Sequence, residues 1–357
     1  MIILAIDTSC DETAAAVTSD NLVLSNIVWS QASEHAKFGG VVPNLAKRAH
    51  EERISWVVEQ AIKRSGVERK KIGAVGVTIG PGLAIALEVG IRQAKNVAGF
   101  LNKPLVVVNH IEGHIFSAMA RRPVKSGRGT ADVNIRFPAW ALVVSGGHTE
   151  LIWVEAPGKY KVAARTLDDA LGEALDKGAR MLGLGYPGGA VLEKLARRGD
   201  PNSYPLPLPM SGQEKRRKFS YSGLKTAMWR LIEKVKESKD ALNAEQIENL
   251  AAVYQERAFD HLIRVSRAIL VSERNEAQDM LCGGGVASNL SLRKKLRVLT
   301  KEAGVKLRLP YSARLCGDNA AMIGVAASFK AVEGKFASDI GLVDRNPDWK
   351  IDDPVIS

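Results

Sequence analysis

The sequence predicts a duplicated α/β fold whose two lobes face each other across a cleft. A strand over residues 2–9 and another over 139–145 each end in a small polar turn. Two further strand-like runs follow each turn, and segments with helical periodicity come after them. Recurrence of the same series of strand, turn and two strands indicates an internal duplication.

Strands and helices alternate in the first half. Helices are expected where apolar residues recur with a period near 3.6, and strands where short apolar runs are bounded by turn residues. The expected strands after the first are 14–18, 22–29, 74–79 and 105–109, and the expected helices are 43–64, 84–101 and one that opens at His110.

The second half repeats the strands and then becomes mainly helical. The expected strands are 151–155, 161–165 and 280–282, and the expected helices are 168–182, 190–198, 221–236, 244–272 and 320–332. We therefore expect a first lobe over 1–125, a linker over 126–137 and a second lobe over 138–318. Residues 319–357 are expected to supply a small-residue helix that packs back toward the first lobe, followed by a tail.

Composition and charge narrow the class of protein. With 357 residues and 46% apolar content, the chain suits about two globular domains. It has no run of 18 apolar residues and starts with a strand-like segment, so neither a membrane span nor a signal peptide is expected. Cys10, Cys282 and Cys316 form no CxxC pair, which favours a reducing, cytoplasmic location.

The net charge of +11 is unevenly distributed along the chain. Basic residues cluster at 121–128, 215–218 and 293–297. Such clusters attract the phosphate backbone of a nucleic acid, so an RNA partner is one interpretation. The alternative is an ordinary solvated basic surface.

His110 and His114 provide the strongest local signal for chemistry. A spacing of four residues places both imidazoles on one face of the expected helix, where they can bind a transition metal. Asp318, just before the helix at 320, is the candidate third ligand, although it could instead cap that helix. Two histidines with one carboxylate leave positions open for substrate, which suits iron or zinc. The alternative is a pair of capping or surface histidines. Glu112, between them, is expected to be solvated.

Three polar or glycine-rich turns, each at the end of a strand, suggest a nucleotide site. Residues 7–9 and 145–149 offer hydroxyls and free backbone N–H groups that can surround phosphate oxygens, and the glycines of 283–289 can lie against a base or ribose. Gly146 and Gly147 allow close approach of the backbone, and Asn289 is a polar handle in the third loop. Any one of these loops alone could be a simple tight turn.

A series of motifs in this order resembles the TsaD family, whose members synthesise threonylcarbamoyladenosine in tRNA. The forms SGGHT and HxEGH are similar to those of its bacterial and organellar branch. The motifs are AIDTSCDET at 5–13, GGVVP at 39–43, HIEGH at 110–114, VSGGHT at 144–149, GEALDK at 172–177, GYPGG at 185–189, FSYSGLK at 219–225 and the loops at 283–289 and 316–322.

The resemblance implies a fold and a reaction. The fold is the duplicated actin-like α/β architecture shared by sugar kinases, Hsp70 and actin, with two lobes around a cleft. The reaction transfers a threonylcarbamoyl group from threonylcarbamoyl-AMP to N6 of the adenosine 3′ to the anticodon, in tRNAs that read codons beginning with A. The implied partners are tRNA, an actin-like paralogue of the TsaB type and a small ATPase of the TsaE type, and no membrane is involved.

The resemblance also implies roles for particular residues. His110, His114 and Asp318 are implied to bind the metal, iron(II) in preference to zinc(II), in agreement with the spacing argument. The residues implied to bind the adenylate are Val144, Ser145, Gly146, Gly147, His148, Asp176, Gly189 and Asn289. We expect Asp11 or Glu12 to accept the proton of the adenine amine, the alternative being that both only order the first turn.

Three rival functions remain for the same residues. A metalloprotease is disfavoured because no Glu follows the first histidine as in HExxH. An actin-like kinase would use the phosphate turns but leave the histidines unexplained. A non-catalytic scaffold is disfavoured because no expected ligand is missing.

Overall fold

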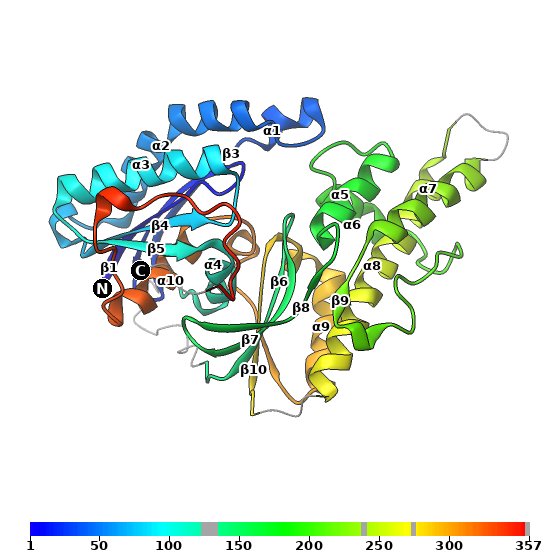
Figure 1. Ribbon diagram of the computed structural model, residues 1–357. Helices are drawn as coiled ribbons and strands as arrows, with labels where there is room; N and C mark the ends of the chain where they lie inside the picture. The colour runs from blue at the N-terminus through cyan, green and yellow to red at the C-terminus, as the bar shows by residue number, and fades with distance from the viewer. Residues whose placement is uncertain (123–134, 237–240, 273–275, 354–357) are drawn as a thin grey trace.

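The first lobe is built on a five-stranded sheet. The computed structural model describes residues 1–122, 135–236, 241–272 and 276–353, and Figure 1 shows this sheet on the left. The strand order is β3-β2-β1-β4-β5; β1 pairs antiparallel with β2, and β2 with β3, whereas β1, β4 and β5 run parallel. The strands are β1 (Ile2–Asp7), β2 (Glu12–Ser19), β3 (Leu22–Ser30), β4 (Ala74–Gly80) and β5 (Leu105–Asn109).

The second sheet repeats the first. Its order is β11-β10-β6-β7-β8-β9, so β8-β7-β6-β10-β11 matches β3-β2-β1-β4-β5 in both order and direction. The duplication inferred from the sequence is therefore confirmed, and β9 is an addition at one edge. The strands are β6 (Ala139–Val144), β7 (Thr149–Ala156), β8 (Lys159–Thr166), β9 (Lys218–Phe219), β10 (Asp279–Gly283) and β11 (Lys306–Arg308).

Helices cover both faces of the first sheet. Long helices α2 (Pro43–Ser65) and α3 (Ala84–Leu101) pack on the outer face, preceded by the short α1 (Ala32–His35). Proline at the first position and left-handed Gly66 after the last turn set the bounds of α2. The inner face is covered by α10 (Ala320–Val332), which contacts all five strands. The last helix of the chain thus completes the core of the first lobe.

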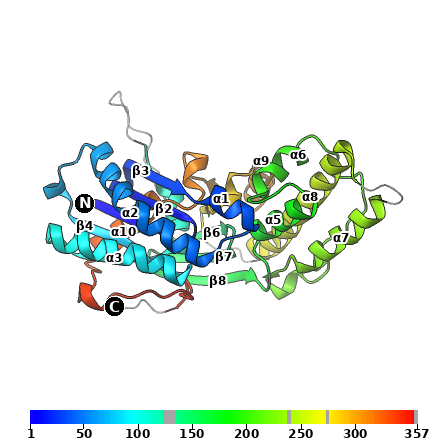
Figure 2. The same cartoon turned by 90° about the horizontal axis from the view of Figure 1, so that it is seen from above.

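The second lobe carries its helices on the side away from the first lobe, as Figures 1 and 2 show. The 29-residue α8 contacts each of the other four and forms the centre of this layer. The helices are α5 (Leu171–Met181), α6 (Gly189–Ala196), α7 (Ser222–Lys236), α8 (Ala244–Ser272) and α9 (Leu290–Glu302).

A shared core joins the lobes. The short helix α4 (His110–Phe116) contacts α10 and β5 on one side and β6 and β10 on the other. Apolar side chains of both sheets meet there, including Val108, Val143 and Leu281. Gly113 allows α4 to approach α10 closely, since a Cβ would lie 2.7 Å from Ile323 Cδ1. The histidine helix is therefore fixed between the lobes.

Residues 346–353, which we call the C-terminal strap, also touch both lobes. The Asn346 N–H donates to Ile79 O (2.7 Å), and Pro347 O accepts from the Gly82 N–H (3.0 Å). At the other end, Asp352 accepts a hydrogen bond from the Arg165 guanidinium of β8 (3.1 Å). The strap therefore links the end of β4 to the second sheet.

Two sequence expectations concern segments beyond these elements. Most of the expected linker, residues 126–134, lies outside the described residues. Among the helices that the structure describes, none combines the length and the apolar character needed to span a bilayer.

Candidate active site

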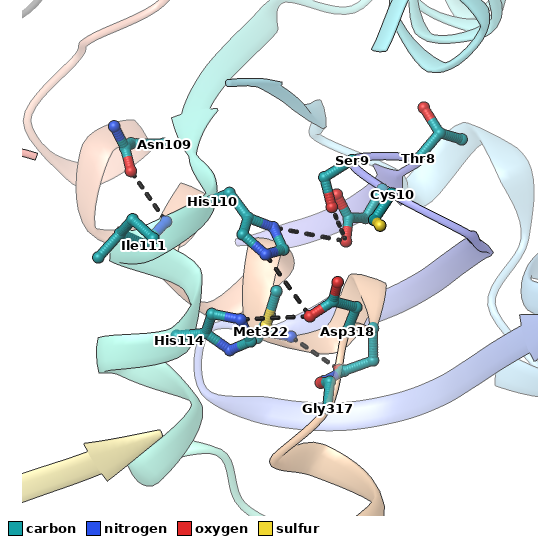
Figure 3. Close-up of polar contacts among 12 residues, drawn as sticks. Thr8, Ser9, Cys10, Asn109, His110, Ile111, His114, Gly317, Asp318 and Met322 are labelled. Carbon is teal, nitrogen blue, oxygen red and sulfur yellow. Dashed lines mark hydrogen bonds and ion pairs between the residues drawn. The ribbon is translucent and has the colours of Figure 1, made fainter. Parts of the chain in front are cut away.

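His110 and His114 lie on the first two turns of α4. The Asn109 side chain accepts a hydrogen bond from the Ile111 N–H (2.8 Å), which caps the helix so that it begins at His110. The two rings are stacked edge to face with centroids 4.6 Å apart, and both are buried. Figure 3 shows both rings directed at Asp318. The spacing of four residues thus places both imidazoles on the same face of α4, as expected from the sequence.

Asp318 brings the third candidate ligand from the other end of the chain. Asn319, not Asp318, caps α10, because its side chain accepts the Met322 N–H (3.1 Å). The Asp318 carboxylate is left to face the histidines, with Oδ1 3.5 Å from His110 Nε2 and 3.2 Å from His114 Nε2. Two metal bonds of about 2.1 Å that meet near the tetrahedral angle separate their ligand atoms by about 3.4 Å. The three side chains therefore have the spacing of a divalent metal site.

The three side chains of the cluster strongly perturb one another's pKa values. Burial opposes charge on His110, but Asp318 and Asp7 raise its pKa to about 10. Burial and the neighbouring His110 lower the pKa of His114, whereas the histidines hold the pKa of Asp318 well below its usual range despite burial. One proton on His110 thus supplies the positive charge here. A cation would supply it instead and release that proton.

Asp7 is a member of the site that the sequence argument did not assign. This fully buried carboxylate ends β1, and its Oδ2 lies 3.8 Å from His110 Nδ1. Ser9 Oγ donates to the same oxygen (3.3 Å). A carboxylate that faces the outer nitrogen of a ligating histidine favours one orientation of the ring. At 3.8 Å, Asp7 acts on His110 by charge and not through a direct hydrogen bond. The sequence signal that could have identified Asp7 was its position at the end of the first strand.

The turn at 144–148 lies at the end of β6, the counterpart of β1. The Ser145 N–H donates to His148 O (2.8 Å) and Ser145 Oγ accepts the His148 N–H (3.1 Å), which closes the turn. Gly146 and Gly147 are exposed, with open space where a Cβ would lie. Burial and the charges of His110 and His114 lower the pKa of His148 to about 3. His148 is therefore neutral and belongs to the same electrostatic environment as the histidine pair.

Asp176 organises the loop before α6. Its Oδ1 accepts the N–H groups of Gly188 (2.9 Å) and Gly189 (2.7 Å). Tyr186 in this loop was not assigned a role from the sequence, although GYPGG was recognised as a motif. Burial and the charges of Asp11, Cys10 and Asp176 raise the pKa of the Tyr186 phenol to about 12. Tyr186 therefore lies within electrostatic reach of Cys10 and Asp11, which follow β1.

Asn289, the expected nucleotide handle, lies immediately before α9 as its capping residue. Its Oδ1 caps α9 by accepting the Ser291 and Leu292 N–H groups (2.9 and 3.1 Å), and its Nδ2 donates to Gln255 Oε1 (2.8 Å). The side chain is 4% exposed. Both polar ends of Asn289 are thus engaged within the protein.

Asp11 and Glu12 lie at the start of β2 and are partly buried. Glu12 Oε1 accepts a hydrogen bond from Ser30 Oγ (3.2 Å). Burial, Asp318 and Asp11 raise the pKa of Glu12 well above its ordinary value. Glu12 is therefore electrostatically linked to the Asp318 carboxylate.

The expectation that Glu112 is solvated is wrong. Glu112 is 2% exposed and forms an ion pair with Lys330 of α10 (3.0 Å). Tyr160 of β8 donates a hydrogen bond to its other oxygen (2.6 Å). Helical periodicity correctly turned Glu112 away from the histidines, but that side of α4 is covered by another helix and by the second lobe.

Comparison with known sequences gives a consistent result along the chain. Residues 22–325 match the TsaD family, described as tRNA N6-adenosine threonylcarbamoyltransferase. A protein of that name from Trichlorobacter lovleyi is 42% identical over 353 residues, covering 99% of this chain and 97% of its own. Another, from Symbiobacterium thermophilum, is 44% identical over 329 residues and covers 92% of this chain and 91% of its own.

Solved structures show the same architecture at low sequence identity. The activator of 2-hydroxyisocaproyl-CoA dehydratase from Clostridium difficile, with bound ADPNP, aligns with a TM-score of 0.51 at 16% identity over 94% of this chain and 97% of its own. HypF of T. kodakarensis aligns with a TM-score of 0.57 at 14% identity, over 94% of this chain and 48% of its own. The fold is the duplicated actin-like α/β fold.

Proposed function

The chain belongs to the TsaD family of tRNA N6-adenosine threonylcarbamoyltransferases, and we propose that its donor is threonylcarbamoyl-AMP and its acceptor the adenosine 3′ to the anticodon. It is an acyltransferase of tRNA modification that forms threonylcarbamoyladenosine. The tRNAs concerned are those that read codons beginning with A. The observation that carries the proposal is the convergence of His110, His114 and Asp318 between the two lobes.

His110, His114 and Asp318 hold one divalent metal ion, iron(II) in preference to zinc(II). The donor set, two imidazoles and one carboxylate at 3.2 and 3.5 Å, supports this assignment. Asp7 orients His110 from behind. When bound, the ion supplies Lewis acidity toward the oxygens of the donor.

The remaining groups of the site bind and orient the adenylate. The open Gly146–Gly147 turn presents backbone N–H groups to phosphate oxygens, flanked by Val144, Ser145 and His148. Asp176 fixes the backbone at Gly189, where the base or ribose packs. Asn289 contributes by capping α9 and holding its loop in place.

Glu12 is the preferred acceptor for the proton that leaves the adenine amine, with Asp11 as the alternative. An exocyclic adenine amine is a weak nucleophile because its lone pair is delocalised into the ring. A carboxylate with a raised pKa removes the proton of such an amine more effectively than an ordinary carboxylate. The raised pKa of Glu12 supports this order of preference.

The full reaction requires partners. The family acts on tRNA, and the basic residues at 215–218 are suited to its backbone. An actin-like paralogue of the TsaB type and a small ATPase of the TsaE type complete the assembly, in the cytoplasm.

A reconstitution tests the proposal. Unmodified tRNA, threonylcarbamoyl-AMP and the two partner proteins are combined with wild-type chain, His110→Ala or His261→Gln, and the modified nucleoside is measured by mass spectrometry. We expect product from wild type and from His261→Gln, a buried histidine of the second lobe, and a loss of at least 100-fold for folded His110→Ala. Wild type that gives no product with active partners would refute the donor assignment, and full activity of His110→Ala would refute the metal assignment.

A further inference from the structure

A buried ion pair joins the histidine helix α4 to α10 on the side of α4 that faces away from the histidines. Glu112 sits between the two histidines in α4, and Lys330 lies near the end of α10, the helix that follows Asp318. The Lys330 ammonium is 3.0 Å from Glu112 Oε2, and the two residues are 7% and 2% exposed. Each helix that carries or follows a candidate ligand therefore contributes one member of the pair.

Each member of the pair has further partners from other segments. Lys330 Nζ donates to Val107 O of β5 (3.1 Å), just before the histidine helix, and lies over the Trp349 ring of the C-terminal strap (5.4 Å). Tyr160 of β8 donates to Glu112 Oε1 (2.6 Å) and accepts the Gly158 N–H (3.0 Å). Burial and Glu112 raise the pKa of Tyr160, so the phenol remains a donor. Five elements, namely α4, α10, β5, β8 and the C-terminal strap, thus meet at this pair.

Stability alone is a poor explanation for charges in this position. Removing two charges from water costs free energy that their attraction seldom repays, and apolar residues of similar volume often stabilise a fold equally well. The neighbouring core is apolar and contains Ile111 and Phe116 of α4 together with Ile323 of α10. What an ion pair adds to such a core is a defined relative placement of the two helices that carry it.

That placement determines the geometry of the cluster. Rotation of α4 about its axis, or a slide along α10, would move His110 and His114 away from Asp318. The contact of Gly113 with Ile323 permits close packing of α4 on α10. It does not fix the rotation of α4, since apolar contacts are not directional. The Glu112–Lys330 pair, with the Tyr160 hydrogen bond, is directional, and its Glu112 lies two residues from each histidine in α4.

We propose that Glu112, Lys330 and Tyr160 form a positioning unit that sets the geometry of the metal ligands and links it to the second lobe. The proposal rests on the metal site assigned under the proposed function. Glu112 and Lys330 are positioning residues that act through α4 and α10, and Tyr160 makes the placement of α4 depend on the β7–β8 hairpin.

The test measures metal binding by the full chain, independently of activity. Wild type, Glu112→Gln, Lys330→Met, the double variant of these two, and Tyr160→Phe are titrated with Zn²⁺ against a chelator. The d–d absorption of bound Co²⁺ reports ligand geometry, and thermal unfolding reports stability. Asp279→Asn is the matched control, because Asp279 is equally buried and pairs with Arg308 (2.6 Å) in the second lobe.

The expected results separate positioning from stability. Glu112→Gln should weaken Zn²⁺ binding 10- to 100-fold and shift the Co²⁺ spectrum, as loss of groups that orient metal ligands does; Tyr160→Phe should weaken it about 3- to 10-fold. Asp279→Asn should lower the unfolding temperature yet change affinity less than 2-fold. The double variant, which leaves no unpaired charge, should regain stability without regaining affinity.

Two outcomes would overturn the inference, and they are distinguishable. If wild type binds Zn²⁺ and Co²⁺ while the folded Glu112 or double variant binds them with unchanged affinity and spectrum, the positioning unit is refuted and the metal site stands. If wild type binds neither ion, the metal site itself fails and the positioning unit fails with it.

Discussion

At the residue scale, His261 is a titratable group held neutral inside the second lobe. It is fully buried on α8, where its Nε2 accepts the Ser220 N–H (3.1 Å), and burial together with Arg264 lowers its pKa to about 4. The unfolded chain binds this proton below about pH 6.5, whereas the folded chain binds it only below about pH 4. The contribution of neutral His261 to the free energy of unfolding is therefore fully present above pH 6.5. It is lost as the pH falls toward 4, by roughly 3 kcal/mol in total.

His261→Gln tests this linkage, since glutamine keeps an acceptor and does not titrate. We expect the free energy of unfolding, measured in urea at pH 7 and pH 5, to fall less in the variant than in wild type, by about 1 to 2 kcal/mol. Part of the acid sensitivity should remain, because burial also lowers the pKa of His50 and His148. Equal losses in the two proteins would exclude His261 as a source.

Asp7 allows a second prediction at this scale. Asp7→Asn removes the buried carboxylate that faces His110 Nδ1, so the ring loses its orienting charge. We expect Zn²⁺ affinity to fall by roughly 10- to 100-fold. Asp20→Asn, an exposed carboxylate that follows β2, serves as the control and should bind Zn²⁺ like wild type. Unchanged affinity in Asp7→Asn would mean that His110 is oriented without it.

At the scale of elements, the packing of α5 on α8 depends on Gly178. A Cβ at this position would fall well inside van der Waals contact with the Tyr254 ring, whose hydroxyl is fixed by a hydrogen bond to Ala174 O (2.8 Å). Gly178→Ala gains about 1 kcal/mol in helix propensity but loses about 1 to 3 kcal/mol through overpacking. The net effect expected in thermal unfolding is destabilisation.

Gly99→Ala is the matched control in α3, because a Cβ there meets nothing within 4 Å. It should leave stability unchanged or raise it by up to about 1 kcal/mol. Destabilisation by both substitutions would attribute the effect to the loss of glycine and not to contact with Tyr254.

Elements with a strong local pattern were predictable from the sequence, and those that exist only through pairing were not. Helices α3, α8 and α10 have the bounds that their periodicity predicted. The two- and three-residue strands β9 and β11 were missed, because each is defined by its hydrogen bonds to a neighbouring strand. Helix α5 begins at Leu171, not 168, because Asp168 accepts hydrogen bonds from residues 220 and 222 instead.

In the candidate site, too, some features were predictable from the sequence and others were not. The proximity of His110 and His114 follows from helical spacing. Asp318 was expected beside them because two histidines need a carboxylate to complete a metal site, and the TsaD resemblance implied the same ligand. The environments of Asp7, Tyr186 and Glu112 were not foreseen, because their partners come from segments far away in the sequence. A one-dimensional pattern can show which way a side chain faces, but not what covers that face.

At the scale of the whole molecule, the excess positive charge predicts salt-dependent binding of tRNA. Lys215 and Arg216 are exposed on the second lobe. Replacing both by glutamine should weaken binding several-fold at low salt and reduce the slope of log K against log salt by about 1 to 2. Binding of unmodified tRNA at several salt concentrations measures this effect.

Lys70→Gln on the first lobe is the control, since Lys70 forms an exposed ion pair with Glu68 (2.8 Å) and its short basic run, residues 69–71, is separate from the clusters at 121–128, 215–218 and 293–297. It should leave the slope unchanged. A slope that is also unchanged in the Lys215 and Arg216 variant would place the tRNA on another face.

The position of α10 in the chain has a consequence for biosynthesis. The inner face of the first sheet, including Ala5, Ala14 and Ala16, is covered by a helix that leaves the ribosome only after the whole second lobe. The intervening stretch of about 210 residues takes roughly 10 to 40 s to translate, and until then this apolar face has no native cover. Because Asp318 immediately precedes α10, the His110–His114–Asp318 cluster forms in the same late step. A chain interrupted before α10 therefore has neither a covered inner face on the first sheet nor a complete His110–His114–Asp318 cluster.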